Sequence, residues 1–115
     1  MKIAIFGTLK PSTSYRDWMH CFRRQFRKTS ISEFSITGSN TILNSYVKQY
    51  ANALTIPVNE YSIDECSDYM RAKATRNNEM IQEADIVVAC VDDLRIINSC
   101  TVAKVPDGYG NHHWS

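Results

Sequence analysis

The chain has 115 residues, of which 43% are hydrophobic and 22% charged, with four glycines and three prolines. This length suits one compact domain, and the composition excludes collagen-like, disordered and coiled-coil classes. No apolar run approaches the roughly 18–20 residues of a membrane-spanning helix, and the N-terminal residues lack the pattern of a secretion signal. We therefore expect a cytoplasmic protein.

The net charge of +1 conceals an uneven distribution. Residues 1–28 carry seven Lys or Arg and one acid, whereas residues 29–115 carry six and eleven. A basic N-terminal segment can attract a polyanion, but the same charges also suit the solvent-facing side of a helix. Nucleic acid is therefore an alternative partner that the low overall charge does not favour.

The cysteines and histidines form no recognisable metal motif. The four cysteines show neither a Cys-x-x-Cys pair nor a zinc-ligand spacing, and the adjacent His112 and His113 have no third ligand beside them. We predict no metal site, no cofactor and reduced cysteines. Cys90 lies inside an apolar run and is expected in the core.

The first half of the chain predicts two strand–helix units. Residues 2–6 form a strand that ends at Gly7, and a helix over about 15–28 follows, with Ser14 as its N-cap. Trp18, Phe22 and Phe26 recur every four residues and give this helix one apolar face.

The second unit begins with a strand over residues 33–37 that also ends at a glycine, Gly38. Asn40 is expected to cap the following helix, which runs to about Leu54. Three later elements follow: a strand within 55–61, a helix over 64–84 with a break near 75–78, and a strand over 86–91.

This alternation is typical of an α/β fold with a parallel sheet. We predict a single Rossmann-like three-layer domain with a mostly parallel sheet of four to five strands. Residues 1–93 form its core. Residues 94–115 form a C-terminal extension or tail packed on the domain or on a neighbouring subunit, and residues 94–105 can hold one more strand or helix.

Polar residues follow three of the predicted strands. In an open parallel sheet, ligands bind at the carboxyl ends of the strands, where Gly7-Thr8, residues 37–40 and Asp92-Asp93 stand. Glycines let a ligand approach the backbone, and helix N-termini offer N–H groups to a phosphate. Neither glycine segment matches the dinucleotide or Walker fingerprint. Asp92-Asp93 suits either a polar turn or a Mg²⁺ ligand pair.

Three segments together resemble the SLOG superfamily of Rossmann-like domains, in particular small YspA-type members related to the DprA and LOG proteins. They are the strand ending in Gly7-Thr8, residues 35–58 with Ser-Ile-Thr-Gly-Ser-Asn and a later Thr-Ile-Pro-Val, and residues 76–89. The last of these, Arg-Asn-Asn-Glu-Met through Ala-Asp-Ile-Val-Val-Ala, is the most specific. The resemblance spans about residues 2–92.

The resemblance implies a pocket for a nucleotide-derived small molecule. The residues matched by position are Gly7, Thr8, Thr37, Gly38, Ser39, Asn40, Arg76 and Asn77. Donors of the 38–40 turn suit phosphate or ribose oxygens, and the Arg76 guanidinium can hold a phosphate bidentately or stack on a base.

We expect this pocket to bind its ligand without catalysis, as a sensor or a sequestering protein. One such role is a phage-encoded sponge for a nucleotide immune signal, which would act in the host cytoplasm. Related phosphoribohydrolases carry a catalytic glutamate in a glycine-rich segment after the fourth strand, where this chain has residues 92–99, Asp-Asp-Leu-Arg-Ile-Ile-Asn-Ser.

Two alternative functions stay open. One is an enzyme acting on an N-glycosidic bond, such as a nucleotide phosphoribohydrolase or a deoxyribosyltransferase, with Asp92 or Asp93 as the substitute carboxylate. The other is a DNA-binding protein of the DprA type that uses the basic first helix.

A homo-oligomer is also expected. The predicted helices carry apolar residues beyond the needs of a small sheet, and the polar tail has no core of its own. The residues expected at the interface are Trp18, Met19, Tyr46, Tyr50, Tyr69 and Met70.

Overall fold

The computed structural model describes residues 1–63, 68–90 and 101–103 of the chain. Strands and helices alternate along these residues, as the sequence pattern predicts. In chain order they are β1 (Lys2–Gly7), α1 (Tyr15–Phe26), β2 (Glu33–Thr37), α2 (Ile42–Leu54), β3 (Val58–Tyr61), α3 (Tyr69–Glu83), β4 (Ile86–Cys90) and β5 (Thr101–Ala103).

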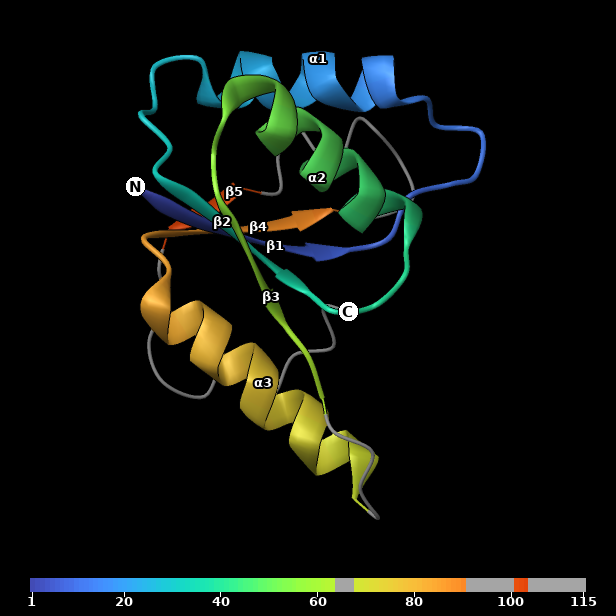
Figure 1. Ribbon diagram of the computed structural model, residues 1–115, viewed down its shortest axis with the longest axis vertical. Coiled ribbons are helices and arrows are strands. Elements are labelled where there is room, and N and C mark those ends of the chain that lie inside the picture. Colours follow the sequence, from blue (N-terminus) through green and yellow to red (C-terminus); the bar gives the residue numbers. More distant parts are fainter. Residues whose placement is uncertain (64–67, 91–100, 104–115) are drawn as a thin grey trace.

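One sheet of strand order β3-β2-β1-β4-β5 forms the middle layer. Strands β1 to β4 run parallel, and β5 pairs antiparallel with β4. Helices α1 and α2 cover one face of the sheet and α3 lies against the other (Figure 1). The expected small Rossmann-like α/β domain, with a mostly parallel sheet, is confirmed.

Strand β1 is apolar from Ile3 to Phe6 because both of its faces are covered there. Ile3 and Ile5 pack in the cluster beneath α1 and α2, whereas Ala4 and Phe6 pack in the cluster against α3. Side chains of a strand alternate between faces, so a central parallel strand buried on both sides shows a continuous apolar run. The run of β4 has the same origin, and Cys90 at its end is buried as expected.

The N-cap of α1 agrees with the prediction, and that of α2 does not. Ser14 Oγ accepts a hydrogen bond from the Asp17 amide at 3.1 Å and caps α1. Helix α2 is capped by Thr41 rather than Asn40, because Thr41 Oγ1 accepts from the Asn44 amide at 3.1 Å. The chain is thus extended for one residue more than predicted before the helix begins.

Helix α3 is continuous through residues 75–78, where the sequence predicted a break. Its buried residues are Arg76, Asn77, Met80 and Ile81. Packing of this face against the sheet outweighs the low helix propensity of two consecutive asparagines. The helix begins at Tyr69 with Asp68 as N-cap, and the predicted start at Asp64 falls outside the described residues.

The surplus of apolar side chains is smaller than the sequence suggested. Trp18 and Tyr50, expected at an oligomer interface, are 0% and 8% exposed and belong to the domain's own core. Tyr69 and Met70 are exposed at 56% and 57%. In the described part of the chain, no helix combines the length and apolar character that crossing a bilayer requires.

Candidate functional site

The turn after β1 needs glycine because the backbone there lies very close to the neighbouring strand β4. Gly7 has φ 120°, and a β-carbon there would lie 1.6 Å from the carbonyl oxygen of Cys90. The Thr8 amide donates to that same oxygen at 3.0 Å. Close approach of β1 to β4 therefore explains Gly7 without a ligand. Ligand contacts by Gly7 and Thr8 stay a prediction, and Asp92-Asp93 lies outside the described residues.

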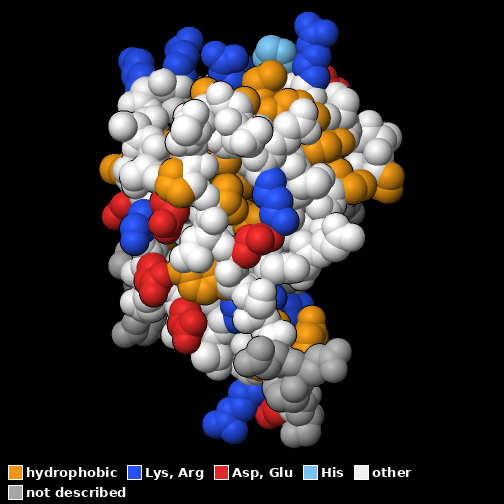
Figure 2. All heavy atoms as spheres, in the orientation of Figure 1, with side chains coloured by type: hydrophobic (Ala, Val, Ile, Leu, Met, Phe, Trp, Pro, Cys, Tyr) orange, Lys and Arg blue, Asp and Glu red, His pale blue; other side chains and the backbone are white. Residues whose placement is uncertain are grey.

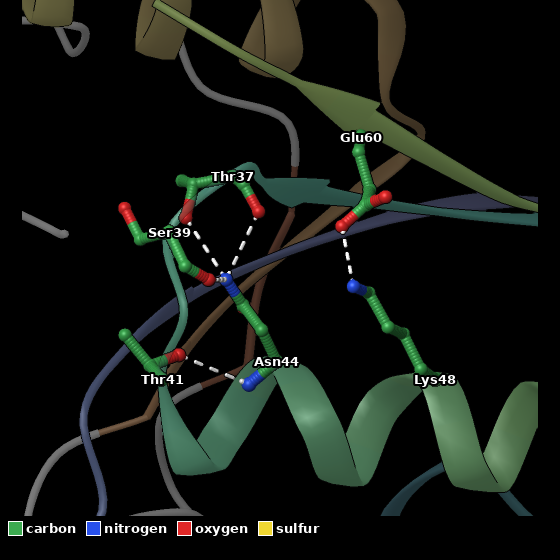
Figure 3. A network of polar contacts seen from close by, with 6 residues as sticks. All are labelled: Thr37, Ser39, Thr41, Asn44, Lys48 and Glu60. Atoms are coloured by element: carbon green, nitrogen blue, oxygen red, sulfur yellow. Dashed lines mark hydrogen bonds and ion pairs between the residues drawn. The ribbon is translucent and has the colours of Figure 1, made fainter.

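The turn after β2 is fixed by one buried amide. The Asn44 side chain is 5% exposed, and its Nδ2 donates to Thr37 O, Thr37 Oγ1 and Ser39 O at 2.9, 3.1 and 2.8 Å. Figure 3 shows this nitrogen bonded to Thr37 and Ser39 and, farther along α2, the exposed Lys48–Glu60 ion pair. Asn44 therefore sets the position of the 38–40 backbone.

Two neighbouring cavities open between the residues after β3 and helix α3, and the smaller one also reaches the turn after β2. The compact one, about 240 Å³, is lined by Gly38, Ser39, Ser62, Ile63, Tyr69 and Arg76. The larger one, about 450 Å³, is lined by Tyr61, Ser62, Ile63, Asp68, Arg71, Ala72, Thr75, Arg76 and Glu79. Since Ser62, Ile63 and Arg76 line both, we call the pair the Arg76 cavities.

Gly38 forms part of the compact cavity and packs against the residue after β3. Its amide donates to Tyr61 O at 2.9 Å, and a β-carbon there would lie 2.7 Å from Ser62 Oγ. The backbone at Gly38 does not have positive φ, so the constraint is one of space. A larger side chain would fill the cavity that Gly38 leaves open.

Arg76 is the buried cation of the site. It is 6% exposed, and its Nε and Nη2 donate to Asn77 Oδ1 at 3.1 and 2.9 Å. Within the described ranges, no carboxylate forms an ion pair with it. Burial lowers the pKa of Arg76, which the nearby Tyr69 phenol opposes, and a guanidinium stays charged at neutral pH. The site therefore holds a positive charge without an anionic partner among the described residues.

The predicted site residues divide into three groups. Gly38, Ser39 and Arg76 come together around the compact cavity. Thr37 and Asn77 are buried supports, the first bonded to Asn44 and the second to Arg76. Gly7, Thr8 and Asn40 do not line either of the Arg76 cavities.

Some residues of the site were not found from the sequence. Asn44 has a signal, since it is a polar residue on the buried side of α2. Glu79 stands within the 76–89 segment of the resemblance, which did not assign it to the pocket. Ser62 and Arg71 follow no motif and reach the cavities only through the path of the chain after β3 and the placement of α3. Among the described residues, no group of three or more His, Cys, Asp or Glu is placed to hold a metal ion.

Tyr61, at the edge of the larger cavity, is tied to α3. Its hydroxyl donates to Glu83 Oε2. Burial first, and then this hydrogen bond and the Glu83 charge, raise the pKa of Tyr61 to about 12. The contact joins the end of β3 to the end of α3 and so helps to fix the cavity wall.

Comparisons of the chain with protein-family models, with curated proteins and with solved structures gave no match.

Proposed function

We propose that this protein binds a nucleotide-derived small molecule in the Arg76 cavities, through an anionic group, and releases it unchanged. The observation that carries the proposal is the buried Arg76 guanidinium, which faces a cavity and has no carboxylate partner among the described residues. A buried charge is unfavourable unless it is paired. A phosphate would supply the missing partner and accept the charge-assisted hydrogen bonds that a guanidinium makes best.

The shapes of the two cavities support a ligand with a compact anionic end and a larger remainder. The 240 Å³ cavity adds Ser39 and the open space at Gly38 to Arg76, which suits a phosphate. The 450 Å³ cavity lies within the range of about 300–1,000 Å³ typical of small-molecule sites. Its mixed lining, with Thr75 and the Arg71 and Glu79 side chains, offers both donors and acceptors to a sugar or a base. The resemblance to the SLOG superfamily points to the same ligand class.

A thermal-denaturation panel tests the ligand class. The probes are adenosine 5′-monophosphate, a cyclic dinucleotide and ADP-ribose, with phosphate-free adenosine as the matched control. A ligand at about 100 times its Kd adds about 2.7 kcal/mol, which raises the Tm of a domain of this size by about 10 °C. Equal shifts with adenosine, or none with any phosphate compound, would contradict the proposal.

An enzyme acting on the N-glycosidic bond is the second candidate, because Glu79 places a carboxylate in the same cavity as Arg76. Such chemistry needs a carboxylate beside the sugar and a group that assists the departing base. The bound compound is recovered after denaturation and analysed by mass spectrometry. Stoichiometric intact ligand supports binding alone, whereas repeated turnover that is lost in Glu79→Gln supports the enzyme.

A further inference from the structure

A separate groove lies on the other side of the sheet, between the second half of α1 and the end of α2. Its volume is about 860 Å³. One rim is basic and consists of His20, Arg23, Arg24 and Arg27 of α1. The opposite wall is apolar and includes Tyr50, Leu54 and Ile56. We call this hollow, defined by these residues, the basic groove.

The rim residues follow the period of one helix face. His20, Arg23, Arg24 and Arg27 are spaced i, i+3, i+4 and i+7, which places them in a row along α1. All are exposed, and in the described part of the chain none forms an ion pair with a carboxylate. Figure 2 shows basic side chains gathered along the α1 edge of the molecule, with apolar surface beside them. The three arginines of the row therefore form a positive stripe with no carboxylate partner among the described residues.

The apolar wall is open to solvent next to that stripe. Leu54, the last residue of α2, is 53% exposed, and Ile56 after it is partly buried. Arg23 lies near enough to Tyr50 for its charge to oppose the rise that burial causes in the Tyr50 pKa. Positive charge and apolar surface thus meet within one hollow rather than on separate faces.

We propose that the basic groove docks an acidic amphipathic helix of a partner protein. Carboxylates at helical spacing on that segment would pair with the arginine row, and its apolar side chains would cover Leu54 and Ile56. A nucleic acid backbone would satisfy the arginines, but it presents no aliphatic groups to the apolar wall. This docking site is independent of the Arg76 cavities, which lie toward the opposite face of the sheet.

The probe is a set of peptides selected from a displayed random library on the immobilised full chain. A length of about 16 residues spans about 24 Å as a helix. Enriched sequences are expected to combine Asp or Glu with Leu or Phe at spacings of three and four. Their affinities are then measured by fluorescence anisotropy, beside a single-stranded oligonucleotide of similar charge.

Two variant pairs with equal change of net charge locate the binding. Arg23→Gln with Arg27→Gln should weaken peptide binding by about tenfold or more, which corresponds to about 1.4 kcal/mol. Arg16→Gln with Lys28→Gln changes the same region outside the groove and should leave the affinity within about twofold.

The apolar wall is tested by Leu54→Ser, with Ile42→Ser at the other end of α2 as its control. Only Leu54→Ser should lower the affinity for the peptides, and thermal denaturation checks that each variant is folded. The proposal would be overturned if the selected peptides lacked acidic residues, or if both charge-changing pairs weakened peptide binding equally. It would also be overturned if the oligonucleotide bound more tightly than any peptide and lost affinity with the same groove variants.

Discussion

Replacing Arg76 by glutamine removes the buried charge and preserves the contact that Asn77 needs. Arg76 Nε and Nη2 share Asn77 Oδ1 as their acceptor, at 3.1 and 2.9 Å. The amide nitrogen of glutamine lies the same number of bonds from Cα as Nε and can keep one donor on that oxygen. Asn77 is 3% exposed, so an Oδ1 left without a donor would cost about 1–3 kcal/mol. Arg76→Gln avoids that loss and isolates the effect of the charge.

Two effects oppose each other in the free protein. A hydrogen bond from a charged donor contributes about 1.5–3 kcal/mol and a neutral one about 0.5–1.5, so the substitution loses about 1 kcal/mol. It also removes a desolvated cation without a carboxylate partner among the described residues, which is favourable by a similar amount. The free energy of unfolding of the free protein should therefore change by less than about 1 kcal/mol.

The thermal stabilities of wild type and Arg76→Gln should differ when the anionic ligand is present. The free energy of unfolding of wild type rises by about 2.7 kcal/mol at a ligand concentration of about 100 times the Kd. That of Arg76→Gln should rise little, because the glutamine amide is uncharged and cannot bind a phosphate bidentately as a guanidinium does. The assay is thermal denaturation with and without the phosphate compound that shifts wild type, with Lys73→Gln on the same helix as control.

Two results would refute this reasoning about Arg76. A loss of more than about 2 kcal/mol in the free variant would make Arg76 a structural residue. An unchanged shift with ligand would place the binding elsewhere in the protein.

Three further predictions concern stability, each measured by denaturation. Asn44→Asp replaces the amide donor by an acceptor facing three oxygens and should cost about 3 kcal/mol, while Asn52→Asp, exposed on the same helix, should be nearly neutral. Thr55 holds a left-handed φ of 58° at the end of α2, so Thr55→Gly should stabilise by about 1 kcal/mol. The pKa of Tyr61 is raised from 10.0 to about 12. The stability that its protonated hydroxyl contributes to the fold is therefore full below pH 10 and is lost as pH rises to about 12. After solvent screening this amounts to about 1 kcal/mol, and Tyr61→Phe should lack this pH dependence.

The order of the elements could be predicted because the pattern repeats. Strands β1 and β4 are marked by short apolar runs, and helices α1 and α2 by apolar residues at helical spacing. Strand β2 is a short segment with alternating polar residues that stops at Gly38, and its predicted bounds agree with the structure. The errors arose where two neighbours suit the same role. Asn40 and Thr41 are both good N-caps, and only the backbone path after Gly38 decides that Thr41 Oγ1 meets the helix amide.

The site could be predicted only in part. The turn after β2 follows from the local sequence pattern, whereas the residues from α3 and after β3 reach the site through tertiary packing. The position of Gly38 and Ser39 follows from the rule that strand carboxyl ends face the ligand. Arg76 was found through a resemblance, and its burial follows from the packing of α3 on the sheet. Ser62 enters the site through the backbone after β3, beside Gly38, and no periodicity in the sequence marks it.

The contrast between two arginines of α3 explains why the Arg76 cavities are a better candidate than the glycine turn of β1. Arg71 is exposed, where water stabilises its charge at no cost to the fold. Arg76, five residues later, is buried beside Asn77, where the same charge is unfavourable until an anion joins it. Gly7, by comparison, is fully explained by its contact with Cys90. Arg76 is a buried charge beside an open cavity, and a bound anionic ligand would account for its placement there.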